Sequence, residues 1–173
     1  MPTLIIEEYN PVWPVRFAEE KQRIQERIGN FIEDIQHVGS TSVPGLAAKP
    51  IVDIMVVIPD ITQVERCVRP LESINYLYMG EYGIPDRHLF CKPGSVSPFE
   101  RLYHLHMMDK THEQYTFHLL FRNYLRKHTD VRDAYQQLKR DLAVQFGANR
   151  EGYTNAKHNF IRSTIVKAQA EQA

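Results

Sequence analysis

An aspartate inside an apolar stretch is the first feature of this sequence that suggests chemistry. Asp53 interrupts the stretch Ile51–Ile58, whose other members are all apolar. An ionised carboxylate in such a strand is costly unless a metal, a cation or hydrogen-bond donors hold it. Asp53 therefore predicts a metal or nucleotide site. A structural salt bridge, for example to Lys49 or to an arginine of the last helices, is the alternative.

A turn of small residues precedes this aspartate, with twelve residues between Ser40 and Asp53. Gly39 and Ser40 follow a β-favouring segment over 31–38, and Thr41 and Ser42 add two more hydroxyls. Glycine lets backbone N–H groups approach a phosphate closely, and hydroxyls supply further hydrogen bonds. The four residues are predicted to bind phosphate, and an ordinary turn is the alternative.

Two histidines with a spacing of i and i+2 form a second candidate group. His104 and His106 fall on a predicted strand, so their side chains share one face, and neutral imidazoles at that spacing can bind a transition metal together. We expect Asp53, His104 and His106 to be catalytic residues, with Asp53 and His106 as metal ligands. Hydrogen bonding of the histidines to neighbouring residues is the alternative.

Hydrophobic periodicity predicts the elements that must position these residues. Along the chain it predicts a helix over 15–30, a strand over 31–38, a helical turn over 43–48, a strand over 51–58, a helix over 60–71, strands over 76–79, 88–92 and 101–108, and helices over 111–127, 129–146 and 154–170. The strand over 51–58 is apolar on both faces, which is typical of a central strand. Residues 1–173 are expected to form a single α+β domain, a mixed β-sheet with flanking helices and a helical C-terminal layer.

The composition excludes several classes of protein. Apolar residues make up 43% and charged residues 24% of the 173 residues, which is typical of soluble globular proteins. The 21 basic and 21 acidic residues balance, so bulk binding to nucleic acid is not expected. No apolar run approaches the roughly 20 residues that a membrane span requires. Two cysteines without CxxC spacing, and acidic residues near the start, favour a cytoplasmic location.

A family resemblance covers nearly the whole chain. His37–Ser40 followed after twelve residues by Asp53–Val56 resembles the signature of the nucleotidyltransferase superfamily. The longer segment His37–Ile54 is similar to the hallmark of the GrpB family, a branch of that superfamily. Further matching blocks are Tyr9–Trp13, His104–His106, Phe121–Arg126 and Tyr153–Lys157. The resemblance implies a nucleotidyltransferase-like fold.

One position departs from the superfamily pattern. Polymerase-type nucleotidyltransferases hold Mg²⁺ on two carboxylates at i and i+2 of one strand, because alternate residues share a face. The second position here is Met55, and a thioether is a poor ligand for a hard cation. The strand of Asp53 therefore lacks the usual carboxylate pair, and His104 or His106 is a candidate to replace the missing ligand.

The resemblance implies a nucleoside triphosphate as substrate or ligand, with Mg²⁺ as the metal and Mn²⁺ or Zn²⁺ as alternatives. Four cations are expected to meet phosphate oxygens, since one precedes the Asp53 strand and the others accompany the matching blocks. They are Lys49, Arg101, Arg122 and Lys157.

Three functions stay open on the sequence alone. The first is transfer of a nucleotidyl group to an acceptor. The second is binding of a nucleotide or another phosphorylated small molecule without turnover, which Met55 favours. The third is metal-dependent hydrolysis centred on Asp53, His104 and His106. The sequence encodes neither the acceptor nor the base preference nor the oligomeric state.

Overall fold

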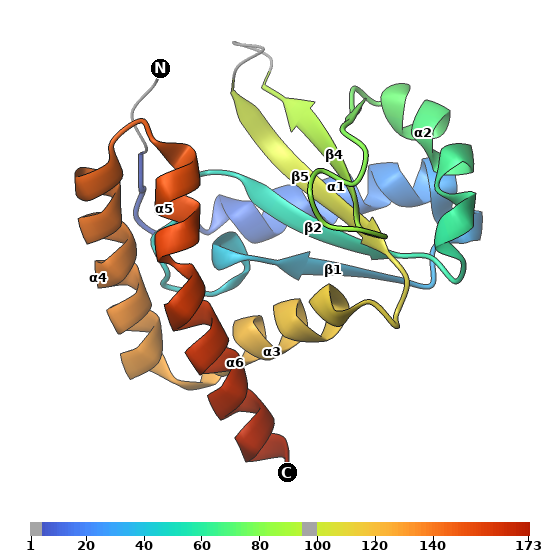
Figure 1. Cartoon of the computed structure of the whole chain (residues 1–173). Helices are drawn as coiled ribbons and strands as arrows, with labels where there is room; N and C mark the ends of the chain where they lie inside the picture. Colours follow the sequence, from blue (N-terminus) through green and yellow to red (C-terminus); the bar gives the residue numbers. More distant parts are fainter. Residues whose placement is uncertain (1–4, 95–99) are drawn as a thin grey trace.

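A computed structural model describes residues 5–94 and 100–173, and in these residues five strands form one mixed sheet (Figure 1). The strands are β1 (Asp34–Val38), β2 (Val52–Val57), β3 (Leu77–Tyr78), β4 (His88–Pro93) and β5 (Arg101–Met108). Their order across the sheet is β1-β2-β5-β4-β3. Only β2 and β5 run parallel, and the other neighbours are antiparallel. The strand with apolar residues on both faces, β2, is interior as predicted.

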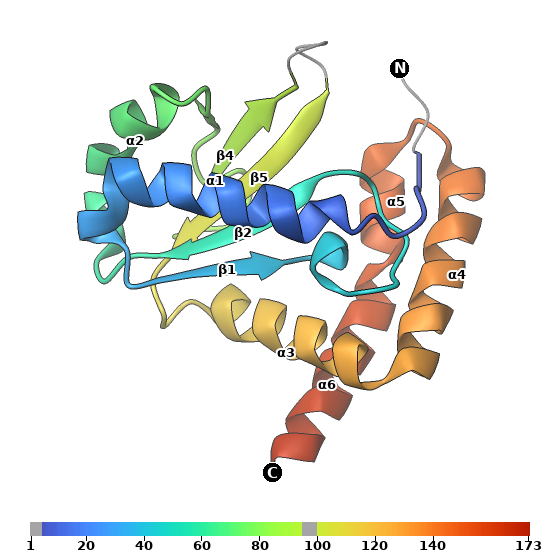
Figure 2. The ribbon, with the colours of Figure 1, turned by 180° about the vertical axis from the view of Figure 1, so that it is seen from behind.

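Helices lie on both faces of the sheet and gather at one of its ends. The helices are α1 (Val12–Ile28), α2 (Glu65–Glu72), α3 (Glu113–Lys127), α4 (Thr129–Phe146), α5 (Arg150–Ala156) and α6 (His158–Gln172), with short 3-10 turns η1 (Gly29–Phe31), η2 (Ser40–Ser42) and η3 (Ile61–Gln63). Seen from behind in Figure 2, α1 crosses one face of the sheet. In both views α3 runs beside β1, and α4, α5 and α6 stand together at one end. This arrangement confirms the predicted α+β class.

Strand alternation separates the main core from the face that carries the candidate site. Val52, Ile54 and Val56 of β2 belong to the core cluster that α1 and α2 cover. Because side chains alternate along a strand, the residues between them point to the opposite face of the sheet. Asp53 and Met55 therefore lie on the face away from α1.

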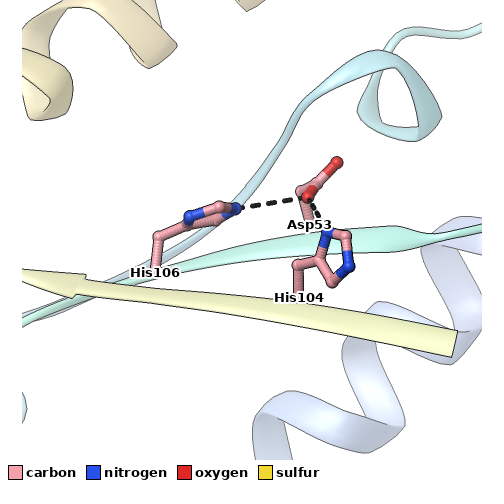
Figure 3. Close-up of side chains that lie close together, drawn as sticks. All are labelled: Asp53, His104 and His106. Carbon is pink, nitrogen blue, oxygen red and sulfur yellow. Dashed lines mark hydrogen bonds and ion pairs between the residues drawn. The ribbon is translucent and has the colours of Figure 1, made fainter. Parts of the chain in front are cut away.

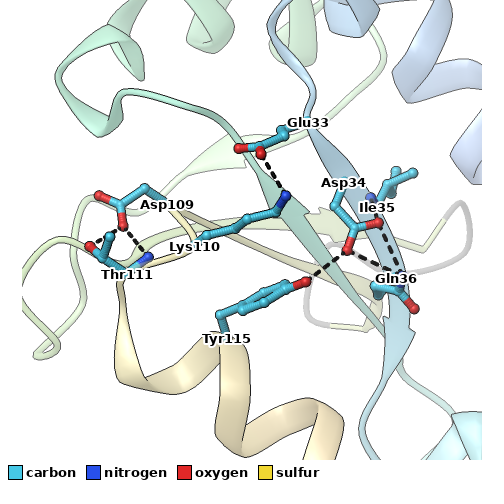
Figure 4. A network of polar contacts seen from close by, with 8 residues as sticks. All are labelled: Glu33, Asp34, Ile35, Gln36, Asp109, Lys110, Thr111 and Tyr115. Carbon is cyan, nitrogen blue, oxygen red and sulfur yellow. Dashed lines mark hydrogen bonds and ion pairs between the residues drawn. The ribbon is translucent and has the colours of Figure 1, made fainter.

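Polar contacts join the β5–α3 loop and α3 to β1 and to Glu33, the residue before it (Figure 4). Lys110 Nζ lies 2.5 Å from Glu33 Oε1, and the Tyr115 hydroxyl donates to Asp34 Oδ2 at 3.3 Å. Asp109 accepts from the backbone and hydroxyl of Thr111. These contacts hold α3 along the outer side of β1.

Two predicted helical segments differ from the structure. The helical turn expected over 43–48 is wrong: the turn is η2, three residues earlier, where Gly39 O accepts from the backbone N–H of Ser42 at 3.1 Å. The helix expected over 154–170 is two helices, α5 and α6, which meet at Lys157. Across the described residues, no helix is both long and apolar enough to cross a membrane.

Candidate functional site

β2 and β5 bring one carboxylate and two imidazoles together. The parallel register pairs Asp53 with His104 and Met55 with His106. Asp53 Oδ1 lies 3.4 Å from His104 Nδ1 and 3.3 Å from His106 Nε2. Figure 3 shows both rings pointing at the same carboxylate oxygen, while the other oxygen points away from them. The structure thus gathers the three predicted catalytic residues in one cluster.

The electrostatics of this cluster favour an ionised carboxylate. Burial alone would raise the pKa of Asp53, but the hydrogen bonds to His104 and His106 outweigh it and hold that pKa well below its usual range. Burial opposes the charge on His104, yet the hydrogen bond to Asp53 raises the pKa of this histidine to about 9. Burial lowers the pKa of His106. These pKa shifts favour an anionic Asp53, a charged His104 and a neutral His106.

The glycine turn lies directly against the free oxygen of this carboxylate. Val38 is the register partner of Asp53, so the chain enters the turn beside the aspartate. Gly39 has φ +72°, and a Cβ atom at this position would lie 2.5 Å from Asp53 Oδ2. The spacing that the sequence motif requires therefore places the turn and the carboxylate in contact.

The hydroxyls of the turn have different partners. Thr41 is buried, and its hydroxyl lies 3.0 Å from His37 Nε2. The Ser42 hydroxyl donates to Gly39 O at 2.5 Å. Ser40 Oγ accepts from Lys139 Nζ at 3.0 Å. Thr41 and Ser42 thus stabilise the turn itself, whereas the Ser40 hydroxyl contacts a charged group on another element.

Three lysines lie near one another, and one of them contacts Ser40. The ammonium groups of Lys49 and Lys157 each lie 4.4 Å from the centre of the Tyr153 ring. Lys139 of α4 is only 2% exposed and also donates to Ala47 O. Within the part of the chain that the structure describes, none of the three lysines forms an ion pair with a carboxylate. We call Lys49, Lys139 and Lys157 the lysine cluster.

Burial and mutual repulsion weaken the charge of the lysine cluster. Burial lowers the pKa of Lys139 to about 7, and the neighbouring Lys157 and Lys49 add to this effect. Burial lowers the pKa of Lys157 to about 8, with Lys49 adding to the shift and Asp53 opposing it. The pKa of Lys49 is lowered as well, first by burial and then by Arg150. An anion with several charges would relieve this repulsion.

Two predicted phosphate-binding arginines have other positions. Arg122 donates from Nη1 to Gln36 Oε1 and to His37 O, both at 2.9 Å, so it holds the end of β1. Arg101 begins β5 opposite Pro93, and among the described residues it forms no hydrogen bond or ion pair with the turn or with Asp53. Of the four predicted cations, the structure brings Lys49 and Lys157 to the site.

Sequence reasoning missed Lys139, the lysine that contacts the turn. A signal for it was present, because Tyr135, Lys139 and Leu142 share one buried side of α4 at spacings of four and three residues. A lysine on an apolar stripe is costly unless it has partners. Its position therefore marked it as a candidate even though its partner could not be named.

Relatives and solved structures similar to this chain point to one family. In sequence, the chain is 36% identical over 161 residues to the UPF0157 protein YqkA of Bacillus subtilis, covering 93% of this chain and 46% of that protein. The chain thus spans about half the length of that relative. In structure, it matches the conserved protein GrpB from Enterococcus faecalis with a TM-score of 0.87 and 35% identity, covering 97% and 99% of the two chains.

A more distant likeness identifies the fold. The Cid1 poly(U) polymerase, in a structure with MgGTP bound, matches with a TM-score of 0.55 at 11% identity, covering 80% of this chain and 44% of that one. At this identity the likeness shows a nucleotidyltransferase-like fold. The sequence profile of the GrpB protein family matches residues 3–167. The chain is therefore a member of the GrpB family.

Proposed function

We propose that this protein binds a nucleoside triphosphate together with Mg²⁺. The observation that carries the proposal is the meeting of three features at one place: the Gly39 turn, the ionised Asp53 carboxylate and the lysine cluster. A phosphate chain needs close backbone approach, a hard cation and several positive groups. The turn offers its backbone, Asp53 would hold the cation, and the lysine cluster supplies the positive groups.

The phosphates would lie between the turn and the lysine cluster. Asp53 Oδ2 takes the space that a side chain of Gly39 would fill, so a phosphate at the turn would lie beside this carboxylate. Lys139 is fixed by Ser40 and Ala47, whereas Lys49 and Lys157 lie over Tyr153 and have no carboxylate among the described residues. Compact ammonium charges are common partners of phosphate oxygens.

The metal would bind through Asp53 and the phosphates themselves. Mg²⁺ is often held by one or two carboxylates plus substrate phosphate oxygens, with water completing the shell. Asp53 supplies one carboxylate, and its Oδ2 faces the turn. Met55, at the position of the usual second carboxylate, is fully buried. The site therefore suits a cation that arrives with the nucleotide, with Mn²⁺ as the nearest substitute.

Binding without turnover is the second candidate, and Met55 is the observation that favours it. Nucleotidyl transfer requires an acceptor to attack the α-phosphorus while pyrophosphate leaves, and two carboxylates usually position the metals for this step. Here one carboxylate is present on β2. A third candidate, hydrolysis with Zn²⁺ on Asp53, His104 and His106, rests on the donor set alone.

We also propose that the protein is located in the cytoplasm. Cys67 and Cys91 are both free and buried, as expected for a protein kept in a reducing compartment. Nucleoside triphosphates and Mg²⁺ are both abundant there. Expression of the chain with a fluorescent tag, followed by cell fractionation, would test the location directly.

Titration calorimetry tests the binding proposal. ATP, CTP, GTP and UTP are titrated into the protein with Mg²⁺ and again with a chelator. At least one should bind in a Mg²⁺-dependent manner, and Asp53→Asn should abolish that dependence. Asp141→Asn, which changes an exposed carboxylate of α4, is the matched control and should bind like the wild type. Unchanged Mg²⁺-dependent binding by Asp53→Asn would refute the role of this carboxylate.

A second experiment separates transfer from binding. The protein is incubated with α-labelled nucleotides, Mg²⁺ and cell extract, and both label incorporation and pyrophosphate release are measured. A transferase would deposit label and release pyrophosphate, and Asp53→Asn would do neither. Nucleotide binding without either product would identify a binding module.

A further inference from the structure

We infer that Arg87 is a positioning residue that holds His106 as an N–H donor to Asp53. In this arrangement Asp53 Oδ1 is occupied by imidazole N–H groups, and a cation reaches the carboxylate through Oδ2. The cation in this statement rests on the proposed function. The hydrogen-bond arrangement itself does not, and it can be tested without any nucleotide.

The Arg87 side chain is buried and contacts the Nδ1 side of the His106 ring. Arg87 is 7% exposed, and its Nη1 lies 3.0 Å from His106 Nδ1. Nη2 donates to the backbone carbonyls of Glu81 and Tyr82 at 3.4 Å and 3.3 Å. Among the described residues, Arg87 forms no ion pair with a carboxylate. A buried guanidinium whose side-chain partner is an imidazole is therefore an unusual feature that needs a reason.

The guanidinium decides which ring nitrogen of His106 carries the proton. Arginine has N–H donors and no acceptor, so His106 Nδ1 must accept from Arg87. A neutral imidazole has one N–H, and it is then on Nε2. Nε2 is the atom that lies 3.3 Å from Asp53 Oδ1. Arg87 thus fixes the tautomer in which His106 Nε2–H donates to Asp53 Oδ1.

This arrangement does not suit His106 as a metal ligand. A ligating histidine offers the lone pair of one nitrogen to the metal and usually donates the other N–H to a carboxylate, a carbonyl or water. The group that contacts His106 Nδ1 is the Arg87 guanidinium, which can only donate. Under this inference His106 is not the metal ligand that the sequence predicts, and His104 and His106 both hold Oδ1. Oδ2 stays on the side of Gly39, where the proposed phosphates lie.

Long-range ¹⁵N–¹H correlation spectra of the nucleotide-free wild type test the inference directly. These spectra identify the protonated nitrogen of each histidine ring, and a His106→Gln variant assigns the signals. We expect the proton of His106 on Nε2. A proton on Nδ1 would overturn the inference, whatever the protein does with nucleotides. Conversely, an Nε2–H ring without any nucleotide binding would keep the inference and refute the proposed function.

Two Arg87 variants test the consequence for metals. Arg87→Gln offers an amide oxygen that can accept from Nδ1–H, so His106 Nε2 becomes free to bind a metal. Co²⁺ or Zn²⁺ binding should then tighten by roughly tenfold or more over the wild type, the scale on which partners of ligating histidines act. Arg87→Lys keeps a donor and should keep both the Nε2–H ring and the weak metal binding. Tight Zn²⁺ binding by the wild type that His106→Gln removes would contradict the inference.

Discussion

The carboxylate of Asp53 occupies the space that a side chain at residue 39 would need. Any Cβ atom there would lie 2.5 Å from Asp53 Oδ2, far inside van der Waals contact. Gly39 also has φ +72° with ψ −176°, a region that is essentially restricted to glycine. The turn and the carboxylate therefore depend on each other: the aspartate can lie in its present position because residue 39 has no side chain.

We therefore expect Gly39→Ala to damage both stability and binding. Strained backbone of this kind costs about 1–3 kcal/mol, and the clash adds to it by displacing Asp53. Urea unfolding and Mg²⁺-nucleotide titration would measure the two effects. Gly83→Ala is the control, because Gly83 has φ +83° but open space around it. The coupling would be disproved by a Gly39→Ala variant that binds normally and loses no more stability than the control.

A carboxylate at position 55 should not restore a metal clamp. Met55 is fully buried and packs with Val38 and Met108 in the cluster that α3 covers. Met55→Glu would bury a charge without a partner, which costs about 3–5 kcal/mol. Met55→Leu, which conserves the volume, should cost less than about 1.5 kcal/mol. Thermal unfolding with and without Mg²⁺ would compare them. Wild-type stability of Met55→Glu, raised further by Mg²⁺, would show that the position can serve a metal.

The contact between the turn and the carboxylate could be predicted from sequence because it depends on local rules. Strand periodicity places residues 31–38 and 51–58 in one sheet, and the motif spacing then puts Gly39 beside Asp53. The same rule of alternation predicted that His104 and His106 share a face. Local pattern was sufficient for these strand residues.

Contacts made by helices and loops could not be predicted in this way. Lys139 and Ser40 are 99 positions apart, and their contact depends on how α4 packs against the turn. Arg87 reaches His106 from the loop between β3 and β4, for which sequence gives no periodic signal. Arg122 has the charge expected of a phosphate ligand but binds His37 O instead. The charge of a side chain did not by itself show whether it would bind other groups of the protein or a ligand.

Lys139 should contribute to phosphate binding directly. Removal of a charged hydrogen-bond donor costs about 1.5–3 kcal/mol, so Lys139→Met should weaken binding of inorganic triphosphate and of ATP by roughly 10- to 100-fold. Lys110→Met is the control, because Lys110 is exposed and pairs with Glu33 on β1's outer side. Calorimetry with both ligands measures the change. Equal affinities of the two variants would exclude Lys139 from the phosphate site.

Binding should also take up protons near neutral pH. The pKa values of Lys139 and Lys157 are lowered to about 7 and about 8, so both lysines are partly neutral between these values. A bound polyphosphate favours their charged forms and raises both pKa values. The complex then holds more protons than the free protein, and by linkage the affinity falls as the pH rises through this range.

Calorimetry in buffers of different ionisation enthalpy measures this proton uptake directly. At pH 8 the wild type should take up protons on binding inorganic triphosphate, and the uptake should decrease in Lys139→Met, where Lys157 is the main group left to titrate. The phosphate itself also titrates near neutral pH, so the comparison of the two proteins with the same ligand isolates the lysine contribution. Identical proton uptake by wild type and Lys139→Met would show that the ligand does not contact the lysine cluster.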